Sequence, residues 1–558
     1  MAATIRDLIA EKVQRAVEEA RKEGVLRLDT LPPIAVEHPS NPQHGDFATS
    51  LPLRLARATR INPMKIAEEL AKLIAPDAEV EQVWVAAPGF INFRLRDEWL
   101  IRQVEAICQA GQDYGALQIG SGQRVIVEYV SVNPTGPVHV GHTRGAVLGS
   151  TLSRVLEAAG YSVTREYYIN DAGSQMEAFY GSIYARYKQA LGQEAELPPG
   201  GYVGSYVTDL AREIVAQEGD RFLSMSQEDV LRELGRIGRE KMVQLIREDL
   251  RHIRVEFDNW FSEGSLYQSG EYENAINILR QGDYISEREG AQWFTSTALG
   301  EDKDNVVVRS TGAPTYFASD IAYHHNKLLQ RGYDQAINIW GADHQGHVPR
   351  MKAAVAALGV DPRRLTIMIA QMVTLKRGQE VVRVSKRAGE FITLREMVDE
   401  VGADACRYFF LARTPATQME FDLELAKKES SENPVYYVQY GYARIGGILN
   451  LARERGIDWS GGNMSLLRDA NELALIRKMV QLPELVESMA RNLEPHHLPH
   501  YALELATAFH WFYENCRVLS SDPADYPLTL ARLKLVEAAQ IALSRTLYLM
   551  DMEAPKRM

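Results

Sequence analysis

The chain has 558 residues and a formal net charge of −12, with 46% hydrophobic and 24% charged residues, which is the composition of an ordinary soluble globular protein of roughly three or four domains. No run of about 18 apolar residues is present, so a membrane-spanning helix is excluded, and the acidic balance argues against a general polyanion binder without excluding a specific RNA partner. The three cysteines lie far apart and form neither a disulfide framework nor a zinc knuckle, so a reducing cytoplasm is the expected location.

The N-terminal part, residues 1–115, has the pattern of a small α/β module. Apolar residues recur at helical spacing over residues 3–22, with charged residues on the opposite face. The elements expected after this first helix are a helix from Thr49, a helix from Pro63, and strands at residues 83–85 and 89–93. A glycine-bearing segment, residues 111–122, is expected to connect this module to the next.

The next pattern is a strand, a loop and a helix in immediate succession. Residues 124–130 are dominated by β-branched and aromatic side chains, and residues 131–138 are rich in Pro, Gly and Asn. A helical pattern follows over residues 141–159, with Gly160 at its expected C-cap. Such a unit opens a nucleotide-binding α/β fold, whose helix N-terminus attracts phosphate. Neither a dinucleotide fingerprint nor a P-loop is present.

Two imidazoles, His139 and His142, stand three residues apart at the start of this helix. The spacing places them near one face of the first turn, where both can donate hydrogen bonds to phosphate oxygens. A His-x-x-His pair can also bind a metal, but no partner cysteine or acidic ligand lies at zinc spacing nearby. The pattern therefore favours a phosphate site, and no metal ligands are predicted.

Further strand patterns predict that this unit belongs to a doubly wound parallel sheet. Strands are expected at residues 161–169, 305–309, 336–340 and 365–373. A helix over residues 315–330 carries Tyr316 and Asp320, which are four residues apart and so lie on one helix face. Polar stretches follow two of the strands, at residues 170–175 and 341–347. The ends of strands in a parallel sheet are where substrate contacts gather.

Residues 190–300 interrupt the sheet pattern, with long amphipathic helices through residues 205–255 and a strand-rich portion near residues 293–297. A parallel sheet interrupted by so long a segment requires an insertion. From Leu394 the pattern is almost wholly helical and predicts an all-α bundle. Its aromatic stripe over residues 435–445 is interpreted as bundle core, since such stripes are more often core than base-stacking platforms.

A basic, glycine-bearing loop, residues 376–389, contains five cations. Most such loops are solvated hairpins. Within it, Arg383-Val-Ser-Lys-Arg387 resembles the KMSKS loop of class I aminoacyl-tRNA synthetases, and Asn133-Pro-Thr-Gly-Pro-Val-His-Val-Gly-His142 resembles their HIGH motif, most closely that of arginyl enzymes. Val140 replaces the isoleucine of HIGH. In the loop, Arg383, Val384 and Arg387 replace the lysine, methionine and serine of KMSKS, which puts the strength of ATP binding in question. Lys386 keeps the place of the second lysine.

This resemblance covers nearly the whole chain apart from the insertion, and it implies a division into domains. Residues 1–115 would be an N-terminal α/β module that contacts tRNA. Residues 116–189 and 301–393 would form a Rossmann-like catalytic domain, with residues 190–300 as a connective insertion. Residues 394–558 would be an α-helical anticodon-binding domain.

The resemblance also implies a ligase that activates L-arginine with ATP and transfers it to tRNA(Arg), releasing AMP and pyrophosphate. Mg²⁺ is expected with the ATP, without identifiable protein ligands, and a monomer is expected. The implied catalytic residues are His139, His142, Lys386 and Arg387. The implied ATP-binding residues are Pro137, His139, Gly141, His142, Gly341, Asp343, His344, Val384, Ser385 and Lys386. The implied arginine-binding residues are Glu128, Asn133, Tyr316, Asp320 and His344.

Two of the arginine-binding residues also follow from charge. A guanidinium is held best by carboxylates that accept paired N–H bonds. Glu128 stands on an otherwise apolar strand, where a carboxylate is rarely buried without a charged partner. Asp320 supplies a second carboxylate, with the Tyr316 phenol beside it.

Two alternatives remain open. A cysteinyl synthetase shares the histidine motif and a helical C-terminus, but it holds zinc through cysteines, and the three scattered cysteines offer no such set. A non-catalytic RNA-binding relative is the other alternative, and the intact histidine pair together with Lys386 argues against it.

Overall fold

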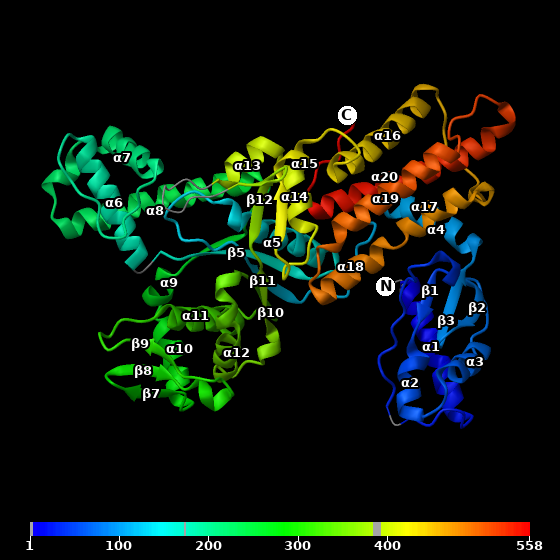
Figure 1. The fold of residues 1–558 in the computed structure, drawn as a ribbon, viewed down its shortest axis with the longest axis horizontal. Helices are drawn as coiled ribbons and strands as arrows, with labels where there is room; N and C mark the ends of the chain where they lie inside the picture. Colours follow the sequence, from blue (N-terminus) through cyan, green and yellow to red (C-terminus); the bar gives the residue numbers. More distant parts are fainter. Residues whose placement is uncertain (1–3, 29, 172–173, 383–391) are drawn as a thin grey trace.

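The computed structural model describes residues 4–28, 30–171, 174–382 and 392–558. The chain is elongated, with a central parallel sheet, a helical lobe at one end, and the N-terminal module and C-terminal helices toward the other (Figure 1). None of the helices formed by these described residues is both long and apolar enough to cross a membrane.

The centre of the fold is a five-stranded parallel sheet in the order β11-β10-β4-β5-β6. Its strands are β4 (Arg124–Glu128), β5 (Ser162–Ile169), β6 (Asn259–Ser262), β10 (Gln335–Gly341) and β11 (Leu365–Ala370). Alternate residues of β4 enter two different cores: Val125 and Val127 pack on the side of α5 (Val140–Ala158), and Ile126 packs with α11 (Tyr316–His325) and α12 (Val348–Ala357). Helices thus cover both faces, and the predicted doubly wound sheet is confirmed.

Close packing of α5 on the sheet depends on a glycine. A Cβ at Gly149 would lie 2.2 Å from the ring of Tyr129, which directly follows β4. Any larger residue would force the helix away from the strand ends. This contact fixes the position of the helix that begins at the histidine pair.

The segment predicted to be an insertion differs from expectation at two places. Residues 259–262 form β6, which pairs in parallel with β5 and is therefore part of the central sheet. Residues 305–308 form β9, which was expected to resume that sheet but instead pairs antiparallel with β8 in a separate three-stranded sheet. The strands of this second sheet are β7 (Ile285–Arg288), β8 (Ala291–Phe294) and β9 (Asn305–Val308). The first difference arises from strand pairing between distant segments, which local pattern does not encode, whereas in the second β9 pairs with a strand close to it in sequence.

The helical lobe consists of α6 (Ser174–Ala190), α7 (Ser205–Glu218) and α8 (Gln227–His252), which share a separate hydrophobic core. Beside the second sheet lie α9 (Gly264–Gln268), α10 (Glu271–Gln281), α11 and α12 (Figure 1). A π-helical turn, Asn326–Gln330, continues α11. Such turns are rare and occur frequently at functional sites.

The N-terminal module is a three-stranded antiparallel sheet with helices. Its elements are α1 (Ile5–Lys22), β1 (Phe47–Thr49), α2 (Leu51–Thr59), α3 (Pro63–Lys72), β2 (Val80–Ala86), β3 (Phe90–Leu95) and α4 (Asp97–Ala110). Arg477 of the C-terminal helices binds Asp46 at 2.7 Å and Asp97 at 3.1 Å. The module is therefore held against the C-terminal region.

The rest of the chain is helical, apart from a small sheet of β12 (Val373–Arg377), β13 (Glu380–Val381) and β14 (Met419–Asp422). The helices are α13 (Leu394–Val401), α14 (Ala403–Leu411), α15 (Leu423–Lys427), α16 (Pro434–Glu454), α17 (Ala470–Met479), α18 (Leu482–Asn492), α19 (His497–Asn515) and α20 (Tyr526–Met550). Asn433 caps α16 by accepting the Val435 N–H at 3.0 Å. The predicted helical bundle is confirmed.

Candidate active site

The histidine pair lies at the N-terminus of α5. His139 is the N-cap, and its Nδ1 accepts the Gly141 N–H at 3.1 Å. The rings of His139 and His142 have centroids 3.7 Å apart. The sequence prediction that the two imidazoles share the first turn is confirmed. An anion at this helix terminus would meet free N–H groups, the helix dipole and both rings.

His142 is neutral in the free protein. Burial, and then the neighbouring His139, lower the pKa of His142 to about 3. Its Nδ1 is buried and has no hydrogen-bond partner among the residues that the structure describes. The ring therefore acts as a neutral hydrogen-bonding group. A bound phosphate would raise the pKa of His142, because a nearby negative charge favours the protonated ring.

The chain that leaves residues 383–391 returns directly to this helix terminus. The Val140 N–H donates to the Ile392 carbonyl at 3.1 Å, and the Leu394 N–H donates to the Val138 carbonyl at 2.7 Å. The loop residues Arg383, Val384, Ser385, Lys386 and Arg387 lie outside the described residues, so their roles stay predictions. The described backbone brings Ile392, just beyond the loop, to the histidine pair.

Glu128, the last residue of β4, is buried against Lys327 of the π-helical turn. Lys327 is fully buried and also donates to the Asn338 Oδ1 at 3.0 Å. The charged partner that the sequence argument required is thus part of the chain. Burial of Glu128 therefore does not by itself call for a bound guanidinium, and its role in arginine binding stays a prediction.

Asp320 lies on α11, is half-buried, and has its pKa raised to about 7. Burial is the main cause, and the negative charges of Glu128 and Glu263 add to it, while Lys327 and Arg350 oppose it. The negative charges of Glu128 and Glu263 are thus only partly compensated at Asp320. A bound guanidinium would relieve this repulsion and lower the pKa of Asp320.

Glu263 is the acidic residue that the sequence reasoning missed. It is only 3% exposed, directly follows β6, and has its pKa raised by burial, with the charge of Asp171 adding to the shift and Ser319 opposing it. A polar strand end at Ser262–Gly264, like the polar stretches that follow other strands of the sheet, is the sequence signal for Glu263. The pattern assigns residues 190–300 to an insertion, so this strand end is not among the predicted sites.

The other predicted arginine-binding residues are Tyr316, Asn133 and His344. Tyr316, one turn before Asp320, is 47% exposed. The Asn133 amide donates to the Gln175 side chain. His344 lies beyond the end of β10, where its ring contacts Trp340 and His347. Their roles stay predictions.

The remaining predicted ATP residues lie near the start of α5 and the end of β10. Pro137 precedes the histidine motif, and Gly141 lies within it in the first turn of α5. Gly341 ends β10, and a Cβ there would lie 2.6 Å from the Asp343 carboxylate. His344 Nε2 is 3.4 Å from that same carboxylate. The C-terminal end of β10 thus presents a glycine, a carboxylate and an imidazole on the strand next to β4.

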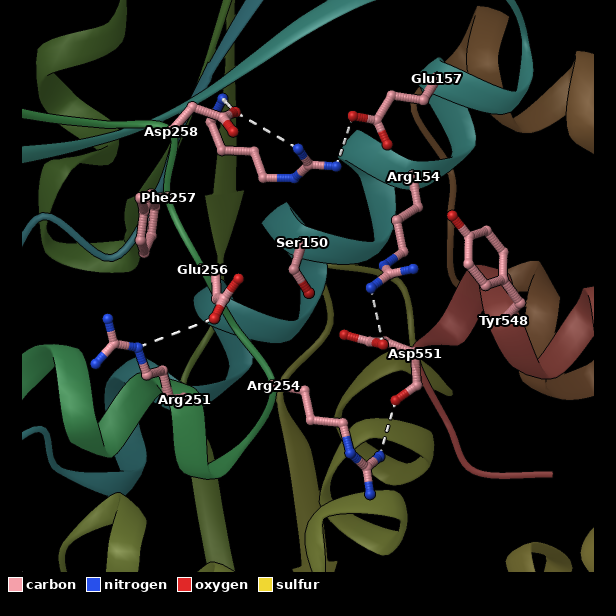
Figure 2. Close-up of a pocket in the computed structure, with 11 residues that line it drawn as sticks. Ser150, Arg154, Glu157, Arg251, Arg254, Glu256, Phe257, Asp258, Tyr548 and Asp551 are labelled. Carbon is pink, nitrogen blue, oxygen red and sulfur yellow. Dashed lines mark hydrogen bonds and ion pairs between the residues drawn. The ribbon is translucent and has the colours of Figure 1, made fainter. Parts of the chain in front are cut away.

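A cavity of about 490 Å³ lies elsewhere, beside the C-terminal half of α5. Figure 2 shows Arg154 of α5 directed toward Asp551, which follows α20; the two groups are 2.8 Å apart. Arg165 pairs with Glu157 at 2.6 Å in the same cavity. The charges of this cavity are largely compensated by one another, and its lining includes none of the predicted site residues.

A parallel sheet whose central strand leads through a Pro/Gly loop into two histidines at a helix N-terminus defines a class I aminoacyl-tRNA synthetase. The model of the class I tRNA synthetase (R) catalytic domain matches residues 103–411. The arginyl-tRNA synthetase N-terminal domain matches residues 3–95, and the DALR anticodon-binding domain matches residues 438–558. The chain belongs to the arginyl-tRNA synthetase family.

Similar proteins agree over the full length. The arginine–tRNA ligase of Dehalococcoides mccartyi strain CBDB1 is 57% identical over 554 residues, 99% of each chain. That of Heliobacterium modesticaldum is 46% identical over 99% of each chain. The structure of Thermus thermophilus arginyl-tRNA synthetase matches with a TM-score of 0.78 at 23% identity over all of both chains, and so shares the fold. The cysteinyl alternative is thereby set aside.

Proposed function

We propose that the chain activates L-arginine with ATP to arginyl-adenylate and transfers the arginyl group to tRNA(Arg), releasing AMP and pyrophosphate. The observation that carries this proposal is the acidic group formed by Glu128 at the end of β4, Glu263 just after β6 and Asp320 of α11, whose charges interact. From Glu128 the chain leads through the Pro/Gly loop to the terminus of α5 that bears His139 and His142. An acidic pocket selects a cationic amino acid, and the helix terminus binds phosphate. This arrangement supports the binding of both substrates of the activation step at one edge of the sheet.

ATP would bind with its phosphates at the N-terminus of α5. Activation is an in-line attack of a carboxylate on the α-phosphorus, so catalysis consists mainly of positioning and charge neutralisation. His139 and His142 would hydrogen-bond the phosphates, with Pro137 and Gly141 shaping the approach. Lys386 and Arg387, with Val384 and Ser385 of the same loop, would stabilise the departing pyrophosphate.

The nucleoside end of ATP would lie at the C-terminal end of β10. Gly341, Asp343 and His344 supply a close backbone approach, an acceptor and a ring there. Polar groups at this end of a parallel sheet are where nucleotides bind in doubly wound folds.

Mg²⁺ would enter as the partner of the ATP phosphates. Over the described ranges, no group of three or more His, Cys, Asp or Glu side chains is arranged to hold a metal ion. The roles assigned to the protein groups therefore involve only binding and orientation. The metal, when bound with ATP, would neutralise phosphate charge.

Arginine would bind with its guanidinium toward Asp320 and Glu263. Glu128, held by Lys327, would form the floor of this pocket, and Tyr316 would lie at its exposed side. Asn133 would orient the α-amino or carboxylate group from the loop that precedes α5. His344 would lie between the arginine and ATP subsites.

The anticodon of tRNA would meet the helical bundle, residues 394–558, and the N-terminal module, residues 1–115, would make a second contact. The aromatic stripe of α16, which the sequence assigned to the bundle core, is partly on the surface, with Tyr440 37% exposed. Tyr436 and Tyr440 are stacked with centroids 6.1 Å apart, and Arg444 lies 4.6 Å over Tyr440. Stacked aromatics beside a cation suit unstacked bases. A monomer and a cytoplasmic location remain part of the proposal.

Charging of total tRNA with each of the twenty amino acids in turn tests the function. Arginine alone should be esterified to tRNA, in an ATP-dependent reaction that yields AMP and pyrophosphate. No charging with any amino acid would support a non-catalytic RNA-binding relative. Charging with a different amino acid would refute the assignment of the acidic pocket.

A further inference from the structure

One acidic residue of the helical lobe lies apart from the proposed pocket but contacts the ATP end of the fold. Asp249, near the C-terminal end of α8, is 1% exposed. The other buried residues of this helix are apolar or glycine. A hydrophobic side chain would satisfy packing at this position, whereas a buried carboxylate costs free energy unless it is paired.

Asp249 has two partners, one directly before the histidine motif of the proposed ATP subsite and one in α13. Its Oδ2 accepts the backbone N–H of Val138 at 3.3 Å, immediately before His139. Its Oδ1 lies 2.9 Å from both the Nε and the Nη2 of Arg395, in the first turn of α13. Burial raises the pKa of Asp249, which Arg395 and Val138 oppose.

These contacts close a ring. Leu394, beside Arg395, donates its N–H to the Val138 carbonyl at 2.7 Å. Val138 therefore uses its carbonyl to bind α13 and its N–H to bind α8. Within the ring Val138–Leu394–Arg395–Asp249, the Asp249 carboxylate joins both the segment before α5 and the start of α13 to the helical lobe.

We propose that Asp249 is a positioning residue that holds the histidine-bearing terminus of α5 and the start of α13 in a fixed mutual position. The helical lobe thereby serves the activation step, because it anchors the backbone of the ATP subsite through one buried carboxylate. This inference rests on the proposed ATP subsite. A displacement of about 1 Å at such a site costs roughly a hundredfold in rate.

A second ion pair joins the same two helices and provides a matched control. His252 at the end of α8 lies 2.5 Å from the Asp399 carboxylate of α13, and both groups are solvent-accessible. This pair spans the α8–α13 contact without touching Val138. Asp399→Asn therefore removes the charge of an α8–α13 ion pair and leaves the ring intact.

The experiment compares Asp249→Ala with Asp399→Asn in steady-state arginine charging by the full chain at saturating tRNA(Arg), with a thermal midpoint for each variant. Asp249→Ala should lower kcat roughly tenfold to a hundredfold at temperatures where it is folded, while KM for tRNA stays within about twofold. Asp399→Asn should match wild type within about twofold. A kcat for Asp249→Ala within about twofold of wild type, or an equal loss in both variants, would overturn the inference.

If Asp249→Ala does not fold, Asp249→Asn and Arg395→Gln replace it. Asparagine can still accept the Val138 N–H but cannot pair with Arg395. Because the two side chains act as one unit, the double variant should lose no more kcat than the worse single variant. Fully additive losses would overturn the inference. Failure of the wild-type chain to charge arginine would instead refute the proposed function.

Discussion

Replacement of Asp320 by Asn separates a binding role from a structural one, because the two roles predict opposite effects on stability. Asparagine keeps the size and hydrogen-bonding capacity of Asp320 and removes its charge. Five groups set the electrostatics there: Asp320 itself, Glu128 and Glu263, which repel its charge, and Lys327 and Arg350, which attract it. The raised pKa means that ionised Asp320 is destabilising in the free protein.

The magnitude follows from proton linkage. The pKa of Asp320 rises from 3.8 to about 7 on folding, and each pKa unit corresponds to about 1.4 kcal/mol. Because the folded state binds the proton more tightly, the stability conferred by the protonated group is fully present below pH 4 and is lost as the pH rises through 7. The full difference is about 4 kcal/mol, and partial exposure of the side chain reduces it to roughly 1–3 kcal/mol. Asp320→Asn should therefore be more stable than wild type at pH 8 by that amount. At pH 5 the gain in stability should be smaller.

Arginine recognition should change in the opposite sense. The variant lacks a carboxylate for the guanidinium, which should cost roughly 3 kcal/mol of transition-state stabilisation. The value of kcat/KM for arginine should therefore fall by about two decades, with KM for ATP little changed. In the wild type, KM for arginine should rise as the pH falls below 7, because Asp320 must lose its proton, and this dependence should vanish in the variant. Charging kinetics from pH 6 to 8.5, with urea denaturation at pH 5 and 8, measure all three effects. Arginine kinetics that match wild type at pH 8 would remove Asp320 from the pocket.

Three other predictions concern separate parts of the molecule. Lys386→Ala should lower kcat by about two to three decades, because a cation that meets charge developing in the transition state is worth roughly 2–4 kcal/mol; a change confined to KM for ATP would show that it binds only the ground state. Lys327→Met leaves Glu128 buried without its partner and should cost roughly 3–5 kcal/mol in urea denaturation, whereas the double variant with Glu128→Gln should recover much of it. Tyr440→Ala should raise KM for tRNA roughly tenfold through lost stacking without changing KM for ATP; an unchanged KM for tRNA would exclude Tyr440 from the anticodon contact.

Local pattern was sufficient wherever the interactions are short in sequence. The strand–loop–helix that places His139 and His142 together depends on β-branched residues, a Pro/Gly loop and a spacing of three, all within one stretch of chain. The caps behave in the same way, as with Asn433 before α16. These elements were predicted correctly because propensity and periodicity determine them before tertiary contacts form.

Only the tertiary structure decided how distant segments pair. Lys327 and Glu128 are 199 residues apart, and the local sequence around either residue does not indicate that the two form an ion pair. Residues 259–262 join the catalytic sheet through a parallel pairing with β5 across the whole helical lobe, and that pairing brings Glu263 to Asp320. Strand partners and buried ion pairs depend on which surfaces meet after the chain has closed long loops. The sequence by itself therefore determined the helix terminus that bears the two histidines, whereas long-range packing decided which acidic groups lie near Asp320.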